Sequence, residues 1–166
     1  MSVATLAVSS NHPLPKRSDP SLIRSIQKIN DLDFGELKAK LMLPEPEGYG
    51  WTQEQVDSAE TWYKRFLILH ALYPEHRNTP SIPVDVFWHA HILDTRRYAA
   101  NCQEIFGHFV HHFPYLGLRG DRDQLLKVFK ETNELYRKEF NTDATLELLG
   151  AGHAADCCDP CSTDEG

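Results

Sequence analysis

The chain has 166 residues, of which 41% are hydrophobic, which is enough for one globular domain with a buried core but short for two. Its 17 basic side chains are outnumbered by 24 acidic ones, and the formal net charge is -7. Such a chain lacks the positive field that duplex DNA or anionic lipid requires, so neither nucleic acid nor a membrane is an expected partner. An unidentified protein partner stays open.

The N-terminal residues do not have the order of a secretory signal, because their apolar run is only a few residues long and has no basic residue before it. No apolar stretch of the sequence is long enough to cross a bilayer. We therefore expect a cytoplasmic protein. Residues 1–17 are rich in Ser, Pro and small side chains, and are predicted to form a disordered, flexible arm ahead of a helical domain over residues 18–150.

The first predicted helix begins at Ser18-Asp19-Pro20, where a capping residue precedes a proline at the first helical position. A second, short helix over residues 34–41 should stop at Pro44. Both segments carry apolar residues at helical spacing, so each is expected to bury one face.

A longer helix is predicted to start at Thr52, which can form a capping box with Gln55, and to end at about Tyr73. His70 falls on the apolar stripe of this helix and is expected to face the core. The next helix should open at Pro83 and continue without interruption to the region of Gly107, which is a natural left-handed cap.

After an irregular segment, Asp121 is predicted to cap a last long helix through about Phe140, followed by a short helical turn over ATLELLG, residues 144–150. The predicted apolar side of this helix consists of Leu125, Leu126, Phe129, Leu135 and Tyr136. No stretch alternates with period two. The predicted fold class is therefore all-α, a single compact bundle of about five or six helices.

The stretch FWHAHILDT, residues 87–95, places His89 and His91 two positions apart in a predicted helix. Since a helix turns about 100° per residue, these side chains point about 160° away from each other and cannot bind one ion from a regular helix. His91 falls in the apolar stripe beside Trp88. His89 lies toward the flank, one turn after Asp85, whose carboxylate can hold an imidazole nitrogen.

Two interpretations of His91 are open. It is either a buried imidazole hydrogen-bonded within the core, or a ligand in a metal site that also takes His70 and one of His111 or His112. Three neutral imidazoles would suit Zn, Fe(II), Cu or Ni. His89 is a further candidate ligand.

No reaction follows from these residues, because no general acid–base carboxylate pair, phosphate loop, nucleophile elbow or zincin motif is found. If the protein is an enzyme, we expect metal-assisted chemistry, with Asp85 or Tyr98 in supporting roles. The alternative is a non-catalytic protein-interaction module in which the WHxH signature is structural. Trp88 and Tyr98 would then pack the core, and Asp85 with His89 would tie a helix start within a buried hydrogen-bond network.

The last residues hold a second group of candidate metal ligands, His153, Cys157, Cys158 and Cys161, in a predicted flexible tail over residues 151–166. Cys158 and Cys161 form a CxxC, whose thiolates suit Zn, Cu(I) or an iron–sulfur centre and could also form a reversible disulfide. The cysteines are not dispersed like the disulfide framework of a secreted protein. A further alternative is that the cysteines of the tail have no role in function.

A dense pattern of polar and aromatic residues marks VDVFWHAHILDTRRYAANCQEIFGHFVHHFPY, residues 84–115: Asp85, Trp88-His89, His91, Asp94-Thr95, Tyr98, Cys102, Gly107 and the later histidine before Pro114-Tyr115. In this pattern the chain resembles the glycine-rich domain-containing protein-like family, and its compact bacterial members more than the long plant ones.

The resemblance implies a helical domain and no particular reaction. The plant members that this chain resembles carry additional glycine-rich and RNA-binding regions, from which it departs, since it has only nine glycines and an acidic balance. The positions to which the resemblance draws attention are Asp85, His89, His91, Tyr98, Cys102 and His112.

Overall fold

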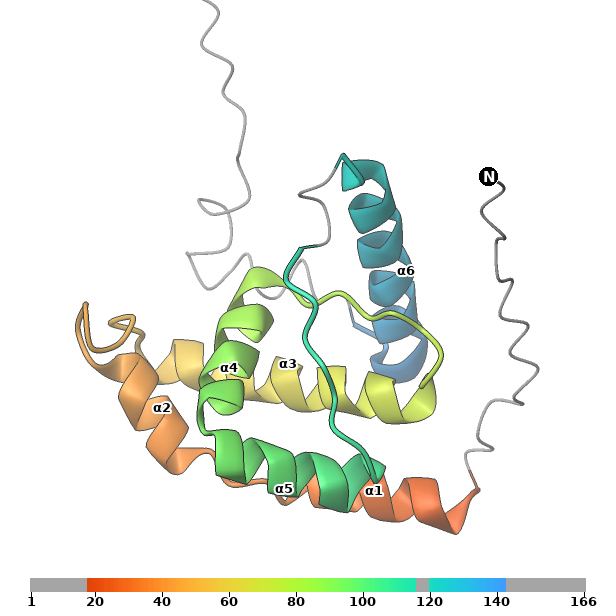
Figure 1. Ribbon diagram of the computed structural model, residues 1–166, viewed down its shortest axis with the longest axis horizontal. Helices are drawn as coiled ribbons and strands as arrows, with labels where there is room; N and C mark the ends of the chain where they lie inside the picture. Colours follow the sequence, from red (N-terminus) through yellow and green to blue (C-terminus); the bar gives the residue numbers. More distant parts are fainter. Residues whose placement is uncertain (1–17, 116–119, 143–166) are drawn as a thin grey trace, which may run out of the picture.

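The computed structural model describes residues 18–115 and 120–142, and these ranges contain six α-helices and no strand (Figure 1). The all-α fold class is thereby confirmed. The predicted arm, the turn over residues 144–150 and the cysteine-containing tail lie outside the described residues. The helices are α1 (Pro20–Asn30), α2 (Gly35–Met42), α3 (Gln53–Leu72), α4 (Ile82–Leu93), α5 (Thr95–Phe106) and α6 (Arg122–Phe140). In the described part of the chain, no helix has the length and apolar character needed to cross a membrane.

Three helix ends follow the local signals in the sequence. Asp19 caps α1 by accepting a hydrogen bond from the Ser21 amide at 2.8 Å. Thr52 and Gln55 form the reciprocal capping box at the start of α3. Gly107 ends α5 with a φ of 75°, a left-handed conformation that glycine adopts readily because it has no Cβ.

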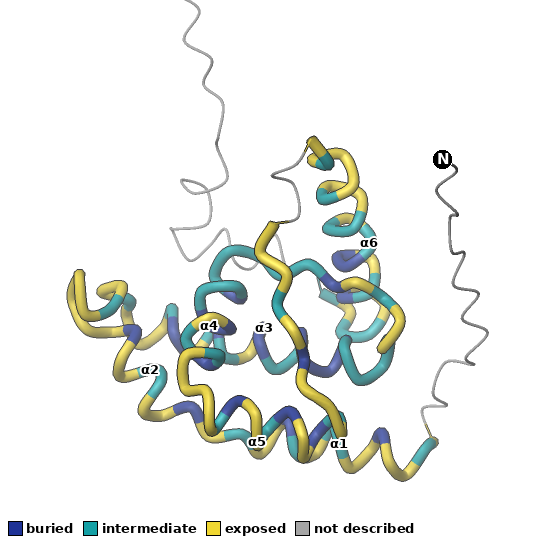
Figure 2. Tube along the Cα trace, viewed as in Figure 1, coloured by how far each residue is buried: buried dark blue, intermediate teal, exposed yellow. Residues whose placement is uncertain are grey.

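The core is built around α3, which packs against α1, α2, α4 and α6. Figure 2 shows the buried positions gathered along this central helix and on the sides of its neighbours that face it. Phe34, Tyr63 and Phe87 form an aromatic cluster between α3 and α4, with ring centroids 5.3 to 5.7 Å apart. Phe34 and Phe87 meet edge to face, an arrangement that stabilises the contact beyond simple area burial.

The segment expected to form one helix from Pro83 to Phe106 is in fact two helices. Asp94, with φ -79° and ψ 68°, ends α4 and begins α5, and its carbonyl accepts the first hydrogen bond of α5 from the Tyr98 amide at 2.8 Å. In one straight helix, Trp88 and Tyr98 would be about 15 Å apart along the axis. The break instead lets the Trp88 indole N–H donate to the Tyr98 hydroxyl at 2.9 Å.

The last helix, α6, has a smaller contact face than the sequence predicts. Leu126, which we expected on the apolar side, is exposed, and the side chain of Asp121 makes no capping hydrogen bond. The buried positions lie in the second half of the helix, at Thr132, Asn133 and Tyr136. Figures 1 and 2 show the first turns of α6 extending away from α3, which leaves this end of the helix more exposed than its second half.

Candidate metal centre

Asp85, His89 and His112 bring three ligand atoms together beside the first turns of α4. The His112 Nε2 atom lies 2.9 Å from Oδ1 of Asp85 and 3.1 Å from Nε2 of His89. The remaining pair, His89 Nε2 and Asp85 Oδ1, is 3.7 Å apart. Among the residues that the structure describes, this is the one set of three His, Cys, Asp or Glu side chains with ligand atoms this close together.

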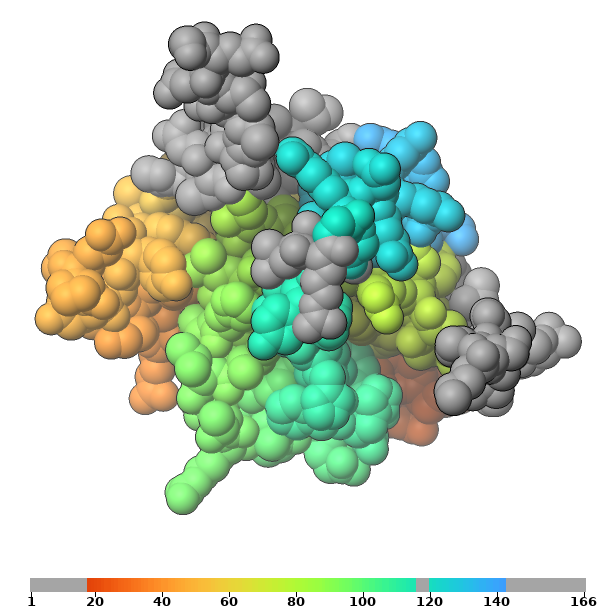
Figure 3. All heavy atoms as spheres, turned by 45° about the horizontal axis from the view of Figure 1, so that its top comes forward, coloured from red at the N-terminus to blue at the C-terminus, as the bar shows by residue number. Residues whose placement is uncertain are grey.

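Two of these side chains come from neighbouring turns of α4, and the third comes from the segment after α5. Asp85 and His89 are four positions apart, which places them on the same face of the helix. His112 lies on residues 107–115, which run back across the bundle in Figure 1 and lie at the surface against α4 in Figure 3. The ligand set therefore depends on where this returning segment is held.

The returning segment is held by a buried hydroxyl. Tyr98 accepts a hydrogen bond from Trp88 and donates one to the carbonyl of Val110 at 2.7 Å. Val110 is buried, and two residues later the His112 ring packs edge-on against Trp88, with centroids 4.6 Å apart. Tyr98 thus positions His112 without touching it.

The geometry of the three ligand atoms suits a metal ion. Bonds of about 2.0 to 2.2 Å in a tetrahedral or octahedral site place adjacent ligand atoms about 3 to 3.5 Å apart. The three separations of 2.9, 3.1 and 3.7 Å are close to these edges. His89 is exposed and the other two are partly exposed, so an ion held here would keep coordination positions open to water or to another ligand.

His91 lies in the core and not beside the other histidines. The Asn101 amide donates to its Nε2 at 3.1 Å, so the neutral ring carries its proton on Nδ1 and donates it to the Tyr63 hydroxyl at 2.9 Å. Its ring packs against Phe34 and Tyr98, with centroids 4.9 and 5.0 Å away. With both nitrogens hydrogen-bonded, His91 has the geometry of the buried structural imidazole, and the described residues do not bring it together with His70, His111 or His112.

The other predicted site residues are spread over different environments. His70 packs against Phe66 in the wall of a cavity, and its Nε2 has no hydrogen-bond partner. His111 is exposed beside Phe109; it is next to the candidate ligand His112 in sequence but does not belong to the group of three. The predicted tail ligands His153, Cys157, Cys158 and Cys161 lie outside the described residues.

The sequence indicates Asp85 only as a supporting residue, whereas in the structure it is one of the three candidate ligands. The signal was present, because the four-residue spacing of Asp85 and His89 is the spacing that puts two ligands on one helix face. The sequence also does not indicate that Tyr63 and Asn101 are the hydrogen-bond partners of His91. Their polar groups carry no pattern that distinguishes them in the sequence.

These features define a small all-α protein whose described residues include a His–Asp group of the kind that could hold a metal ion. The chain belongs to the UCP032817-like family, whose model matches residues 28–145. The match includes α2 to α6 and all three candidate ligands. The family description names no activity and no glycine-rich domain. No curated protein and no solved structure matches the chain.

We predict that Tyr98→Phe loosens the returning segment. The change leaves the Trp88 N–H and the Val110 carbonyl buried without their partner, and it should lower the free energy of unfolding by about 1 to 3 kcal/mol, measured in urea. Amide hydrogen exchange of residues 110–112 should become faster. The control is Tyr49→Phe, since Tyr49 is exposed, and it should change stability by less than about 0.5 kcal/mol. Unchanged exchange in Tyr98→Phe would contradict the positioning role.

We also predict that the fold loses stability on acidification. Burial lowers the pKa of His70 and of His91 to about 4, and the nearby Arg97 charge adds to the effect at His91. The unfolded chain takes up these protons as the pH falls through about 6.5, whereas the native chain does not until about 4. The contribution of each histidine to the free energy of unfolding is therefore fully present above about pH 6.5 and is lost as the pH falls toward 4. The total loss is up to roughly 3 kcal/mol for each histidine.

The measurement is urea unfolding at several pH values between about 4.5 and 7.5, with a chelator present. His70→Gln and His91→Gln should each give a flatter dependence of unfolding free energy on pH than the unmodified chain. Slopes that are the same in all three proteins would show that these imidazoles are not the groups responsible.

Proposed function

We propose that the protein binds one divalent transition-metal ion through Asp85, His89 and His112. The observation that carries the proposal is the convergence of one carboxylate oxygen and two imidazole nitrogens with separations of 2.9, 3.1 and 3.7 Å. All three atoms are hydrogen-bond acceptors when the imidazole nitrogens are unprotonated. They can face one point only if a proton or a cation lies between them.

The donor set supports Zn²⁺ or Fe²⁺ within the wider group of Zn, Fe, Cu and Ni. Imidazole suits all four metals, and the carboxylate adds a harder oxygen ligand. Two histidines and one carboxylate with open positions are typical of catalytic zinc sites and of non-haem iron sites. An ion bound this way could polarise a carbonyl group or lower the pKa of a bound water molecule, which is the metal-assisted chemistry that the sequence suggests.

Other parts of the proposal rest on the sequence alone. A separate thiolate site in the tail, at Cys157, Cys158, Cys161 and His153, would bind a soft metal or switch with redox state. Grouping the chain with the glycine-rich domain-containing proteins is supported by the signature over residues 84–115. Neither is needed for the His–Asp centre to bind an ion.

The metal proposal predicts one equivalent of bound metal per chain and a selective loss in ligand variants. Protein purified without a histidine tag would be analysed for metal and then titrated with Zn²⁺ after chelator treatment. His89→Ala or His112→Ala should weaken zinc binding by roughly 100-fold or more, because removing a ligand costs at least as much as disturbing its surroundings. The matched control is His111→Ala, the neighbour of His112, which should bind zinc as the unmodified chain does.

A second readout separates metal binding from a structural role. Zinc at about 100 times its dissociation constant should raise the free energy of unfolding by about 2.7 kcal/mol in the unmodified chain and have little effect in His112→Ala. If no metal binds and His89→Ala, a change within the WHxH signature, lowers stability equally with and without chelator, the signature is structural. That outcome would favour the non-catalytic interaction module.

A further inference from the structure

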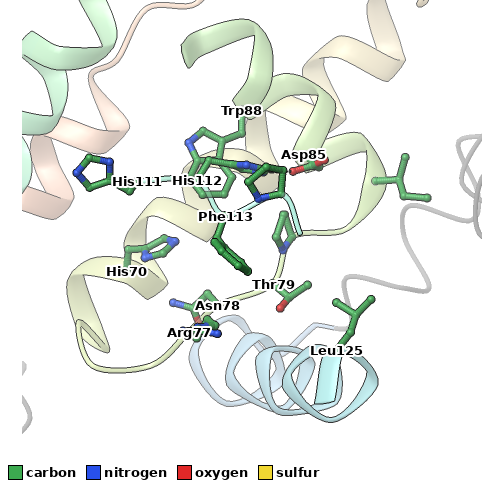
Figure 4. A pocket seen from close by; sticks show the side chains of 13 residues that line it. His70, Arg77, Asn78, Thr79, Asp85, Trp88, His111, His112, Phe113 and Leu125 are labelled. Carbon is green, nitrogen blue, oxygen red and sulfur yellow. Dashed lines mark hydrogen bonds and ion pairs between the residues drawn. The ribbon is translucent and has the colours of Figure 1, made fainter. Parts of the chain in front are cut away.

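The metal centre opens on a cavity that the sequence did not reveal. The start of α4, the segment around Asn78, the segment around Phe113 and the first half of α6 enclose a volume of about 440 Å³. Small-molecule sites in proteins are commonly this large. Asp85 and His112 line the cavity, and Figure 4 shows them on one side of it, with Arg77 and Asn78 on the opposite side.

Two buried hydrogen-bonding groups in this cavity have no partner in the described residues. Asn78 is only 7% exposed, and its Oδ1 accepts from His76 Nδ1 at 3.0 Å, which leaves its Nδ2 unsatisfied. The Nε2 atom of His70 is also buried and unsatisfied. An unpaired buried donor costs about 1 to 3 kcal/mol, and native proteins retain few of them. Both lie in the wall of one cavity, where a ligand that enters it can supply the missing partner.

The charges around the cavity favour an anionic ligand. Arg77 has no ion-pair partner in the part of the chain that the structure describes, and its guanidinium lies 5.9 Å from the centre of the Phe113 ring. Among the described residues that line the cavity, Asp85 is the one acidic side chain, and it faces His112. The side opposite the metal centre therefore presents a cation and amide or imidazole donors. Much of the remaining wall is apolar, formed by residues such as Ile82, Trp88 and Leu125.

We infer that the cavity binds a small organic carboxylate with an apolar body. Its carboxylate accepts hydrogen bonds from Arg77, Asn78 and His70, and its body packs against Trp88. Phe113 is 57% exposed and its ring lies in the middle of the view in Figure 4, so this side chain has to turn for the ligand to reach the buried donors. Binding of the carboxylate does not require the proposed metal ion, because Arg77, Asn78 and His70 are not among the proposed metal ligands. The inference rests on the proposed function only for the further point that the bound molecule would lie next to the ion.

The test compares phenylacetate with phenylacetamide, which has the same shape without the charge. Isothermal titration of the full chain would use protein loaded with Zn²⁺ and protein treated with EDTA. Phenylacetate should bind in both states and at least about tenfold more tightly than phenylacetamide, because charge-assisted hydrogen bonds to a guanidinium are the strong ones. Equal affinities for the two compounds, or no binding of phenylacetate in either state, would overturn the inference.

Two variants assign the contacts. Arg77→Gln and Asn78→Asp should each weaken phenylacetate binding by about tenfold or more, the first by loss of the cation and the second by repulsion. Arg96→Gln is the matched control, since Arg96 is exposed on α5 and does not line the cavity. Arg77 is itself exposed, so its variant should fold normally even if Asn78→Asp does not. Undiminished binding in Arg77→Gln would overturn the inference.

The same titrations separate this inference from the metal proposal. Zinc uptake without phenylacetate binding leaves the metal proposal standing and overturns the carboxylate site. Phenylacetate binding that depends on Arg77, in protein that takes up no zinc, supports the carboxylate site and removes the metal proposal.

Discussion

The hydroxyl of Tyr98 joins three segments that the rest of the site depends on. It accepts from Trp88 on α4, belongs to α5, and donates to Val110 on the returning segment. Burial raises the pKa of Tyr98 well above its ordinary value, so the hydroxyl keeps the proton that it donates. Because these groups are away from water, losing either hydrogen bond leaves an uncompensated polar atom. The break at Asp94 is what allows this junction, and the junction in turn places His112.

The short helix α4 places His89 and His91 in two different environments, because side chains two positions apart point to nearly opposite sides of a helix. His91 points into the core, where Tyr63 and Asn101 use both of its ring nitrogens. His89 points outward with Asp85, where neither side chain is fully buried. A hydrogen-bonded imidazole in the core helps to fix how α4 packs, whereas the partly exposed candidate ligands Asp85 and His89 are open to other partners. The two histidines of the WHxH signature therefore differ in role: His91 is a packing residue of the core, and His89 is a candidate ligand at the surface.

Most of the fold could be predicted because its signals are local. Helix caps such as Asp19 and Thr52 act within one turn, and the sequence shows them directly. The break at Asp94 was missed because the apolar stripe continues across it, and periodicity alone cannot show that a helix changes direction. An aspartate followed by Thr95 is a recognisable N-cap signal, but the pattern on both sides outweighed it. The exposure of Leu126 depends on where α6 crosses α3, which is tertiary information.

The candidate site could be predicted in part for the same reason. Asp85 and His89 are related by helix geometry, so their proximity can be derived from spacing. His112 joins them only because Tyr98 binds the Val110 carbonyl, a contact between a side chain and a backbone group that has no sequence signature. Without that contact, His111 and His112 are equivalent candidates. The cavity could not be predicted from the sequence, because Arg77 and Asn78 lie in a loop and no sequence pattern specifies the path of that loop.

The charge of the chain bears on how the proposed site would select its ligand. With a formal net charge of -7, the protein as a whole repels anions at long range. Within the cavity the balance would reverse with an ion bound, because a divalent ion would exceed the charge of Asp85 and Arg77 adds a further positive charge. Long-range repulsion is screened beyond about 8 Å at physiological ionic strength, whereas contacts inside a cavity are screened far less. Recognition of a carboxylate would therefore depend on short-range hydrogen bonds and shape, and polyanions too large to enter the cavity would be excluded.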